Sequence, residues 1–179
     1  MAKLTYQIDP AHSSAQFSVR HMMISNVRGE FTKLSGAIVY DPEHPEQSNV
    51  DVTIDVSSIS TREDQRDTHL KSGDFFDAEK FPTITFKSKE VVAQKNGDVK
   101  LTGDLTIRGV TREVVLDVEG PTPESKDPWG NLRIGASATT KINRKDFGLT
   151  WNSTLETGGL LVGDEVKITL DVEAIRQSS

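Results

Sequence analysis

The chain of 179 residues predicts an all-β protein, an elongated eight-stranded antiparallel β-barrel with one helical segment near residues 60–72. Three observations lead to this prediction. Apolar and polar residues alternate over most of the chain, which is the pattern of strands that bury one face. Only one longer segment carries the end signals of a helix. With so little helix to cover them, half-polar strands must close on themselves or stack as two sheets.

Eight segments show the alternation, and in chain order they are 14–22, 27–41, 49–56, 83–92, 97–109, 112–120, 131–142 and 165–174. The first segment puts four side chains on one face: Ala15, Phe17, Val19 and His21. In segment 27–41, Phe31 and Ile38 are out of phase, which predicts a kink or bulge near Ser35 and Gly36. Asn96-Gly97 is a hairpin turn signal between two of the later strands.

The helical segment is SISTREDQRDTHLKSG, residues 58–73. Ser60 and Glu63 have the spacing of a capping box, and Gly73 is a candidate stop at the C-terminal end. A second stretch, NRKDFG at residues 143–148, predicts a single helical turn.

The choice between a barrel and a sandwich depends on the interior. The strands are long for a sandwich, and small inward residues leave room along the axis: Gly103, Ala136 and Ala138. An eight-stranded barrel encloses side chains or one small ligand. The sequence therefore favours a barrel with an apolar cavity, and a filled sandwich is the alternative.

Composition limits the partners. The formal net charge of −6 and a pI near 5.2 argue against nucleic-acid binding, which needs a basic surface. There is no cysteine, and no apolar run approaches the length of a membrane span, so we expect no stable membrane insertion. The N-terminus has no signal-like apolar region, so we expect a cytoplasmic protein, or a periplasmic one if a leader has been removed. We expect one domain over residues 1–179.

Catalytic chemistry has little support in the sequence. The four histidines show no metal-ligand spacing, no glycine-rich phosphate loop is present, and we expect no metal and no cofactor. His12 and Ser13 are neighbours whose side chains point to opposite faces in extended chain, so we interpret them as a turn that enters the first long strand. His21 shares the inward face, where it is either satisfied by backbone carbonyls or a polar contact for a ligand head group.

Four of the seven phenylalanines lie in one window, Gly73–Ser88, after the predicted helix: Phe75, Phe76, Phe81 and Phe86. Pro82 biases Phe81 toward extended geometry, so a strand is expected to begin there, with Ile84 and Phe86 pointing inward. One of the pair Phe75 and Phe76 is expected to pack from the helical segment onto the barrel end. The other is expected to touch a ligand or a second subunit. The window is therefore interpreted as the junction between lid and barrel.

Several motifs together resemble one family. IDPAHSSAQFSVRHMMISNVRGEF resembles the opening of the YceI-like proteins, a polyisoprenoid-binding family with a lipocalin-like barrel. The central signature of the family resembles REDQRDTHLKSGDFFDAEKFPTITFKS in this chain. Two later blocks of the family resemble GDLTIRGVTREVVLDV and INRKDFGLTW. The resemblance covers nearly the whole chain in the family's order. It implies a bound isoprenoid lipid such as a polyprenyl phosphate or quinone-like chain, a homodimer, and roles in storage, transport or stress protection. Many members are exported to the periplasm.

We therefore expect non-catalytic binding of a long isoprenoid lipid. The predicted ligand-binding residues are Phe17, Val19, His21, Phe31, Phe75, Phe76, Ile84, Phe86, Leu105, Ile107, Leu116 and Ile134. Two alternatives remain open at this point. One is an enzyme, a hydrolase or isomerase, that uses the barrel as its pocket. The other is a structural or partner-binding protein whose barrel is filled by its own side chains.

Overall fold

The computed structural model describes residues 3–95, 98–153 and 161–178. These residues form twelve strands, one α-helix and four short 3₁₀ turns. The strands are β1 (Leu4–Ile8), β2 (Ser14–His21), β3 (Ser25–Phe31), β4 (Leu34–Tyr40), β5 (Asn49–Asp55), β6 (Ile59–Ser60), β7 (Thr83–Ala93), β8 (Val99–Ile107), β9 (Val110–Glu119), β10 (Ser125–Lys126), β11 (Leu132–Asn143) and β12 (Val162–Arg176). The helix α1 spans Asp64–Lys71, and the turns are η1 (Pro10–His12), η2 (Pro45–Gln47), η3 (Val56–Ser58) and η4 (Arg144–Phe147).

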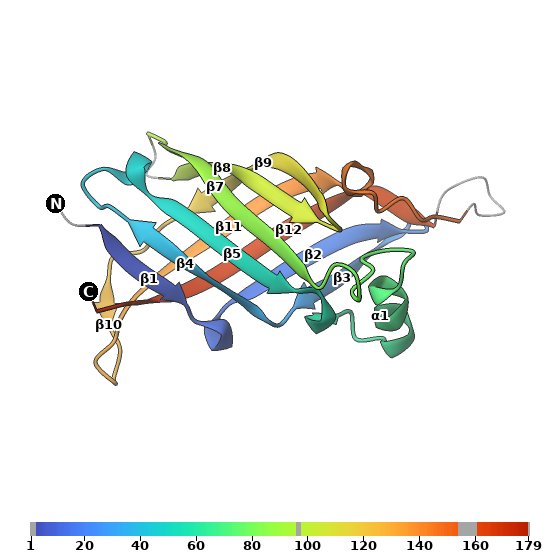
Figure 1. The fold of residues 1–179 in the computed structure, drawn as a ribbon, viewed down its shortest axis with the longest axis horizontal. Helices are drawn as coiled ribbons and strands as arrows, with labels where there is room; N and C mark the ends of the chain where they lie inside the picture. The colour runs from blue at the N-terminus through green and yellow to red at the C-terminus, as the bar shows by residue number, and fades with distance from the viewer. Residues whose placement is uncertain (1–2, 96–97, 154–160, 179) are drawn as a thin grey trace.

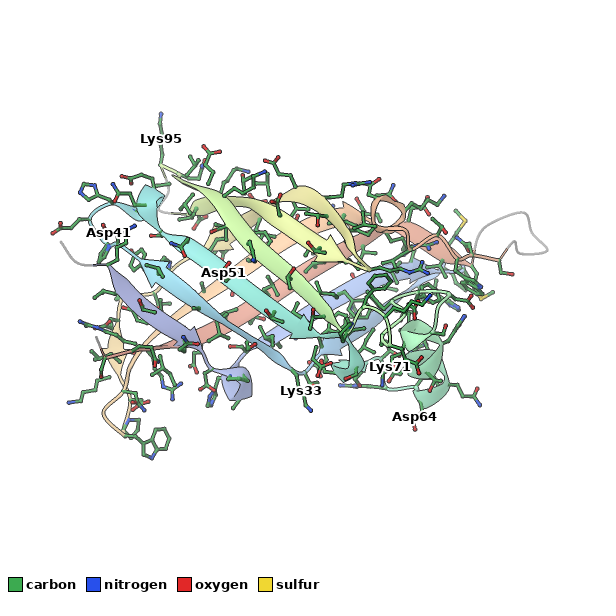
Figure 2. The ribbon with its side chains drawn as sticks, viewed as in Figure 1. Lys33, Asp41, Asp51, Asp64, Lys71 and Lys95 are labelled. Carbon is green, nitrogen blue, oxygen red and sulfur yellow. The ribbon has the colours of Figure 1, made fainter. Side chains whose placement is uncertain are left out.

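Eight strands form a closed antiparallel ring in the order β11, β9, β8, β7, β5, β4, β1 and β12, and the pairing of β12 with β11 closes it. The strands run obliquely along an elongated barrel, and α1 lies near one end (Figure 1). Charged side chains such as Lys33, Asp64 and Lys95 project away from the barrel (Figure 2). The predicted all-β, eight-stranded barrel with one helix is confirmed.

The membership of the ring differs from the sequence prediction in two places. β1 was not predicted, and segment 27–41 is two strands, β3 and β4, because the chain bends at Thr32 and Lys33. β12 pairs with β2 over its first part, up to Asp171, and with β1 over its last part, from Ala174. β2 and β3 therefore extend the wall at one end of the barrel, and β1 completes the ring at the other.

The kink predicted near Ser35 and Gly36 is wrong, because both residues lie inside β4 and pair with β5. Gly36 has a different role. Its φ is +151°, and a Cβ at this position would lie 2.0 Å from the carbonyl oxygen of Asp51. The glycine therefore allows the two backbones to approach closely.

The helix begins and ends by contacts that the sequence suggested only in part. The predicted capping box is wrong: Ser60 belongs to β6, and the carboxylate of Glu63 accepts a hydrogen bond from the amide of Gln65 at 3.3 Å. Ser72 ends the helix by donating its amide to the carbonyl of His69, one residue before Gly73. The predicted turn at 143–148 is confirmed as η4, which ends at Gly148 with φ of 77°.

Buried apolar side chains form one large cluster along the barrel and a small one, Tyr6, Ile134 and Ala174, at the end away from α1. No described helix has both the length and the apolar character needed to cross a membrane. The predicted turn at Asn96-Gly97 lies outside the described residues.

Candidate functional site

The barrel encloses a cavity of about 340 Å³, and apolar side chains make nearly all of its wall. The alternation seen in the sequence explains this wall. Ala15, Phe17, Val19 and His21 of β2 all border the cavity, and the partner strand β12 adds inward residues of its own: Val166, Ile168, Leu170 and Val172. Each strand thus turns its apolar face to the cavity, while its other face remains polar.

The cavity is long. On β12 its wall runs from Val162 to Val172. A strand of this length spans about 33 Å, and with the usual barrel tilt it covers about 25 Å along the barrel axis. A bilayer's hydrocarbon core is about 30 Å thick, so one leaflet accounts for about 15 Å. The apolar wall of the cavity is therefore longer than one bilayer leaflet is thick.

The end away from α1 is closed by the small cluster around Tyr6, whose side chain is 1% exposed. The hydroxyl of Tyr6 donates to Glu124 at 2.5 Å, and Arg176 donates to the same carboxylate at 3.1 Å. Burial, followed by the hydrogen bond to Glu124, raises the pKa of Tyr6 to about 12. Glu124 therefore ties the segment between β9 and β11 to the Tyr6 cluster at this end.

The other end is the mouth, where α1 and the segment after it form a lid. Phe75 is buried and packs against Trp151, with ring centroids 5.3 Å apart. Phe76 meets Phe31 edge-on at 5.8 Å, and Phe31 in turn contacts Phe17 at 5.7 Å. The predicted junction between lid and barrel is present, and both members of the Phe75–Phe76 pair face the cavity.

A buried guanidinium holds the mouth together. Arg144 of η4 is 3% exposed and donates to four carbonyl oxygens, those of Leu149, Trp151, Val162 and Gly163. Its nearest carboxylate, Asp164, is 3.7 Å away. Burial lowers the pKa of Arg144, and Asp164 opposes that shift. One side chain thereby ties the loop after η4 to the start of β12.

The titratable side chains that line the cavity are basic or imidazole groups. Five basic or imidazole side chains border it: Arg20, His21, Arg66, His69 and Arg144. Among the described residues that line it there is no Asp or Glu, although the chain carries 27 acidic residues. Arg66 donates through Nε and Nη2 to the hydroxyl and carbonyl of Thr61, each at 2.8 Å, which fixes it at the mouth. The lining of the mouth therefore carries basic side chains, while the nearby carboxylates of Asp74 and Asp164 lie outside the lining.

Eleven of the twelve predicted binding residues border the cavity: Phe17, Val19, His21, Phe31, Phe75, Phe76, Ile84, Phe86, Leu105, Ile107 and Leu116. Their contact with a ligand stays a prediction. The placement of Ile134 in the cavity wall is wrong, because this residue packs with Tyr6 and Ala174 in the closed end. The side chain of Ile134 is on the inward face of β11, as expected, but it lies past the end of the cavity along the barrel axis.

The sequence interpretation missed several side chains at the mouth: Leu70, Arg144, Leu149 and Trp151. Leu70 and Arg66 lie four residues apart on α1, so their shared face was readable from helical periodicity. The others lie on η4 or the loop after it, and no alternation marks them. The alternation predicts that Arg20, next to the inward His21, faces solvent; it is exposed and also reaches the rim of the cavity.

One side-chain group away from the cavity has the composition of a metal site. The ligand atoms of Asp9, His12 and Glu173 lie within 4.8 Å of one another. Arg133 already donates to Asp9 at 2.8 Å and lies 3.4 Å from Glu173, so a guanidinium neutralises these carboxylates. His12 ends η1, which confirms the turn predicted ahead of the first long strand.

Comparison with known proteins agrees with this architecture. The family model of the YceI-like domain matches residues 6–174. A UPF0312 protein of Staphylococcus aureus is 40% identical over 169 residues, which cover 94% of this chain and 95% of the relative. The crystal structure of a Campylobacter jejuni YCEI protein is 38% identical with a TM-score of 0.75, over 89% of this chain and 90% of that one.

A polyisoprenoid binding domain from Saccharophagus degradans has the same fold, with a TM-score of 0.70 at 17% identity, over 97% of this chain and 99% of that one. The match to residues 6–174 and the 40% identity over almost the full length lead to one conclusion. The chain belongs to the YceI-like domain family.

Proposed function

We propose that this protein binds one long-chain isoprenoid lipid in the barrel cavity and performs no reaction on it. The observation that carries the proposal is the length of the apolar wall, about 25 Å along the axis, against about 15 Å for one bilayer leaflet. Each methylene that leaves water contributes about 0.8 kcal/mol, so affinity rises with chain length and needs few polar contacts. The polyisoprenoid binding domain from Saccharophagus degradans, which shares the fold, supports an isoprenoid chain.

The basic side chains in the lining of the mouth support an anionic head group, such as that of a polyprenyl phosphate, over a neutral quinone-like one. Arg20, His21 and Arg66 border the cavity beside the lid, and no described lining residue is acidic. An anion at this position gains attraction from several charges that have no acidic competitor inside the cavity. The tail would occupy the barrel, with the head group near α1.

The alternative functions fit the structure less well. A barrel enzyme needs a general base with an orienting carboxylate inside the pocket. His21 has no such partner among the described lining residues. His69 borders the cavity and bonds Asp74 at 2.9 Å, but Asp74 is half-exposed and outside the cavity lining, and the His69 ring lies edge-on to Phe75 and Trp151. A filled core conflicts with the cavity itself.

The direct test is to block the cavity. Ala138 lines its wall, whereas the next residue, Thr139, faces solvent. We expect Ala138→Trp to abolish the lipid seen by native mass spectrometry after gentle purification or after addition of polyprenyl phosphate. The matched control, Thr139→Trp, should keep it. Circular dichroism melts verify that both variants fold. An empty wild-type protein that gains no mass from added polyprenyl lipid would refute the proposal.

We further propose that binding serves transport or storage, so that the lipid is exchanged rather than consumed. Transfer of a fluorescent polyprenyl phosphate between two vesicle populations tests this. Catalytic amounts of the protein should accelerate transfer, and the Ala138→Trp variant should not. The expected homodimer is tested by sedimentation velocity.

A further inference from the structure

The tip of the β2–β3 hairpin exposes three consecutive apolar side chains. Met22, Met23 and Ile24 are 40%, 65% and 76% exposed. The amide of Ile24 donates to the carbonyl of His21 at 3.1 Å, so these residues form a tight turn between the two strands. A protruding apolar tip of this kind is costly in water and is unusual on a charged surface.

The turn has the wrong residues for its backbone. Met22 and Met23 have φ values of 52° and 61°, both in the left-handed region. A hairpin turn with positive φ at both central positions strongly favours Asn-Gly, because long side chains are strained there. Two methionines at these positions oppose the local preference. Such departures occur where function requires the side chain.

The tip lies at the mouth of the cavity. The amide of Met22 donates to the carbonyl of Leu161 at 2.8 Å, and Leu161 and His21 both border the cavity. The hairpin is also basic. No carboxylate occurs between Asp9 and Glu30, whereas Arg20 and Arg28 are exposed on the two strands. Arg20 donates to the carbonyl of Met23 at 2.8 Å, which holds a cation directly behind the apolar tip.

We propose that this hairpin tip docks the mouth of the barrel onto an anionic lipid bilayer. The side chains of Met22, Met23 and Ile24 insert between the acyl chains, and Arg20 and Arg28 lie at the level of the lipid phosphates. Apolar insertion combined with attraction to anionic lipid is the general basis of reversible interfacial binding. The inference rests on the proposed function, because a docked mouth gives a lipid tail a path into the cavity that avoids water.

The test is co-sedimentation with vesicles of phosphatidylcholine and phosphatidylglycerol, with phosphatidylcholine vesicles as the comparison. The double variant Met22→Asn/Met23→Gly gives the turn its preferred residues and removes two apolar side chains. We expect binding to the mixed vesicles to fall roughly tenfold or more, with a melting temperature equal to or above that of the wild type. The control is Trp129→Ser, because Trp129 is 79% exposed on the β10–β11 turn near the closed end. It should bind vesicles as the wild type does.

Equal vesicle binding by the double variant, or an equal loss in Trp129→Ser, would overturn the docking proposal. A shift in oligomeric state by sedimentation velocity, confined to the double variant, would also overturn it, since the tip would then be a contact between copies of the chain. A separate readout covers the proposed function. Polyprenyl phosphate delivered from detergent should load the double variant as fully as the wild type in native mass spectrometry. If neither protein loads, the lipid-binding proposal fails, and the vesicle result still decides the docking.

Discussion

Phe75 packs against Trp151 with ring centroids 5.3 Å apart, and this contact joins the segment after α1 to the loop after η4. His69 lies edge-on to both rings, at 5.1 Å from Phe75 and 4.7 Å from Trp151. Two segments that are far apart in sequence thus meet over the cavity mouth. Aromatic packing holds the lid together with Arg108, whose guanidinium donates to the carbonyls of Gly73 and Gly148.

The first prediction follows from this contact. Phe75→Ala removes a buried ring and leaves a hole between the lid and the barrel, so we expect it to lower the free energy of unfolding by about 3–5 kcal/mol. Urea denaturation measures this loss. Trp129→Ala is the matched control, because that aromatic ring is exposed and its removal should leave stability nearly unchanged. An unchanged unfolding midpoint for Phe75→Ala would show that the lid does not depend on this ring.

Phe76 is expected to behave differently. It is only half-buried, and it contacts Phe31 at 5.8 Å on the cavity side. We expect Phe76→Ala to destabilise the fold less than Phe75→Ala and to shorten the retention of bound lipid more. The time course of lipid loss into excess empty vesicles, followed by native mass spectrometry, measures retention. The reverse order of effects would mean that Phe76 is structural and that Phe75 is the ligand contact.

Arg144 is the subject of the third prediction. Replacing it with Met removes a donor from four carbonyl oxygens, of which only that of Val162 has a second side-chain donor, Asn152, among the described residues. Loss of a partner in such a buried polar cluster costs roughly 3–5 kcal/mol. Arg144→Lys should recover little, because an ammonium cannot reproduce the planar fork of donors. Urea denaturation is again the measurement. The neighbouring Lys145→Met tests whether loss of a nearby charge alone matters, and it should cost less than about 1 kcal/mol. Similar losses of stability in Arg144→Met and Lys145→Met would contradict this role of the Arg144 guanidinium.

The sequence predicted best what depends on local alternation. Ile84 and Phe86 of β7 face the cavity because every second residue of a strand shares a face, and that rule needs no knowledge of the rest of the chain. Alternation does not show how far along the barrel axis a side chain lies. Ile134 has inward parity yet lies in the closed end, because the shear of the barrel sets its level.

Other features depend on distant pairing and were not predictable from local pattern. β1 is not one of these features, because Leu4, Tyr6 and Ile8 alternate with Thr5 and Gln7; its pattern was readable locally, and the sequence interpretation overlooked it. Arg144 lies in a polar stretch whose composition indicates a turn. Its burial follows from the return of β12 across η4, which brings the carbonyls of Val162 and Gly163 to the guanidinium.

Acid should weaken the closed end through Arg133, which donates to Asp9 at 2.8 Å and to Asp127 at 2.6 Å. Hydrogen bonds from Arg133 and then His12 hold the pKa of Asp9 at about 2, below its ordinary 3.8. Burial opposes the shift for Asp127, but bonds from Arg133, Asn131 and Trp129 still hold its pKa at about 2. Because the folded-state pKa values are lowered, their stabilisation is complete above pH 3.8 and is lost as the pH falls toward 2.

We therefore expect Arg133→Met to be less stable than the wild type at neutral pH and to lose less of its remaining stability between pH 4 and pH 2. Melting temperatures across this range measure the difference. Lys141→Met, an exposed cation on the same strand, is the control and should follow the wild-type pH profile. Parallel profiles for Arg133→Met and the wild type would show that the Arg133 cluster does not set the acid limit.

Alkali should act on the same end through Tyr6. Its pKa is raised from 10.0 to about 12 because the phenol is buried and donates to Glu124. A phenol that must stay protonated in the fold stabilises it below pH 10, and this contribution is lost as the pH rises toward 12.

Tyr6→Phe keeps the ring that closes the barrel but cannot ionise. It should be slightly less stable than the wild type at pH 7, where the hydrogen bond is lost, and should retain more of its stability above pH 10. Tyr40→Phe, on the adjacent strand, is the matched control. If Tyr6→Phe and the wild type lose stability in parallel above pH 10, another group governs alkaline unfolding.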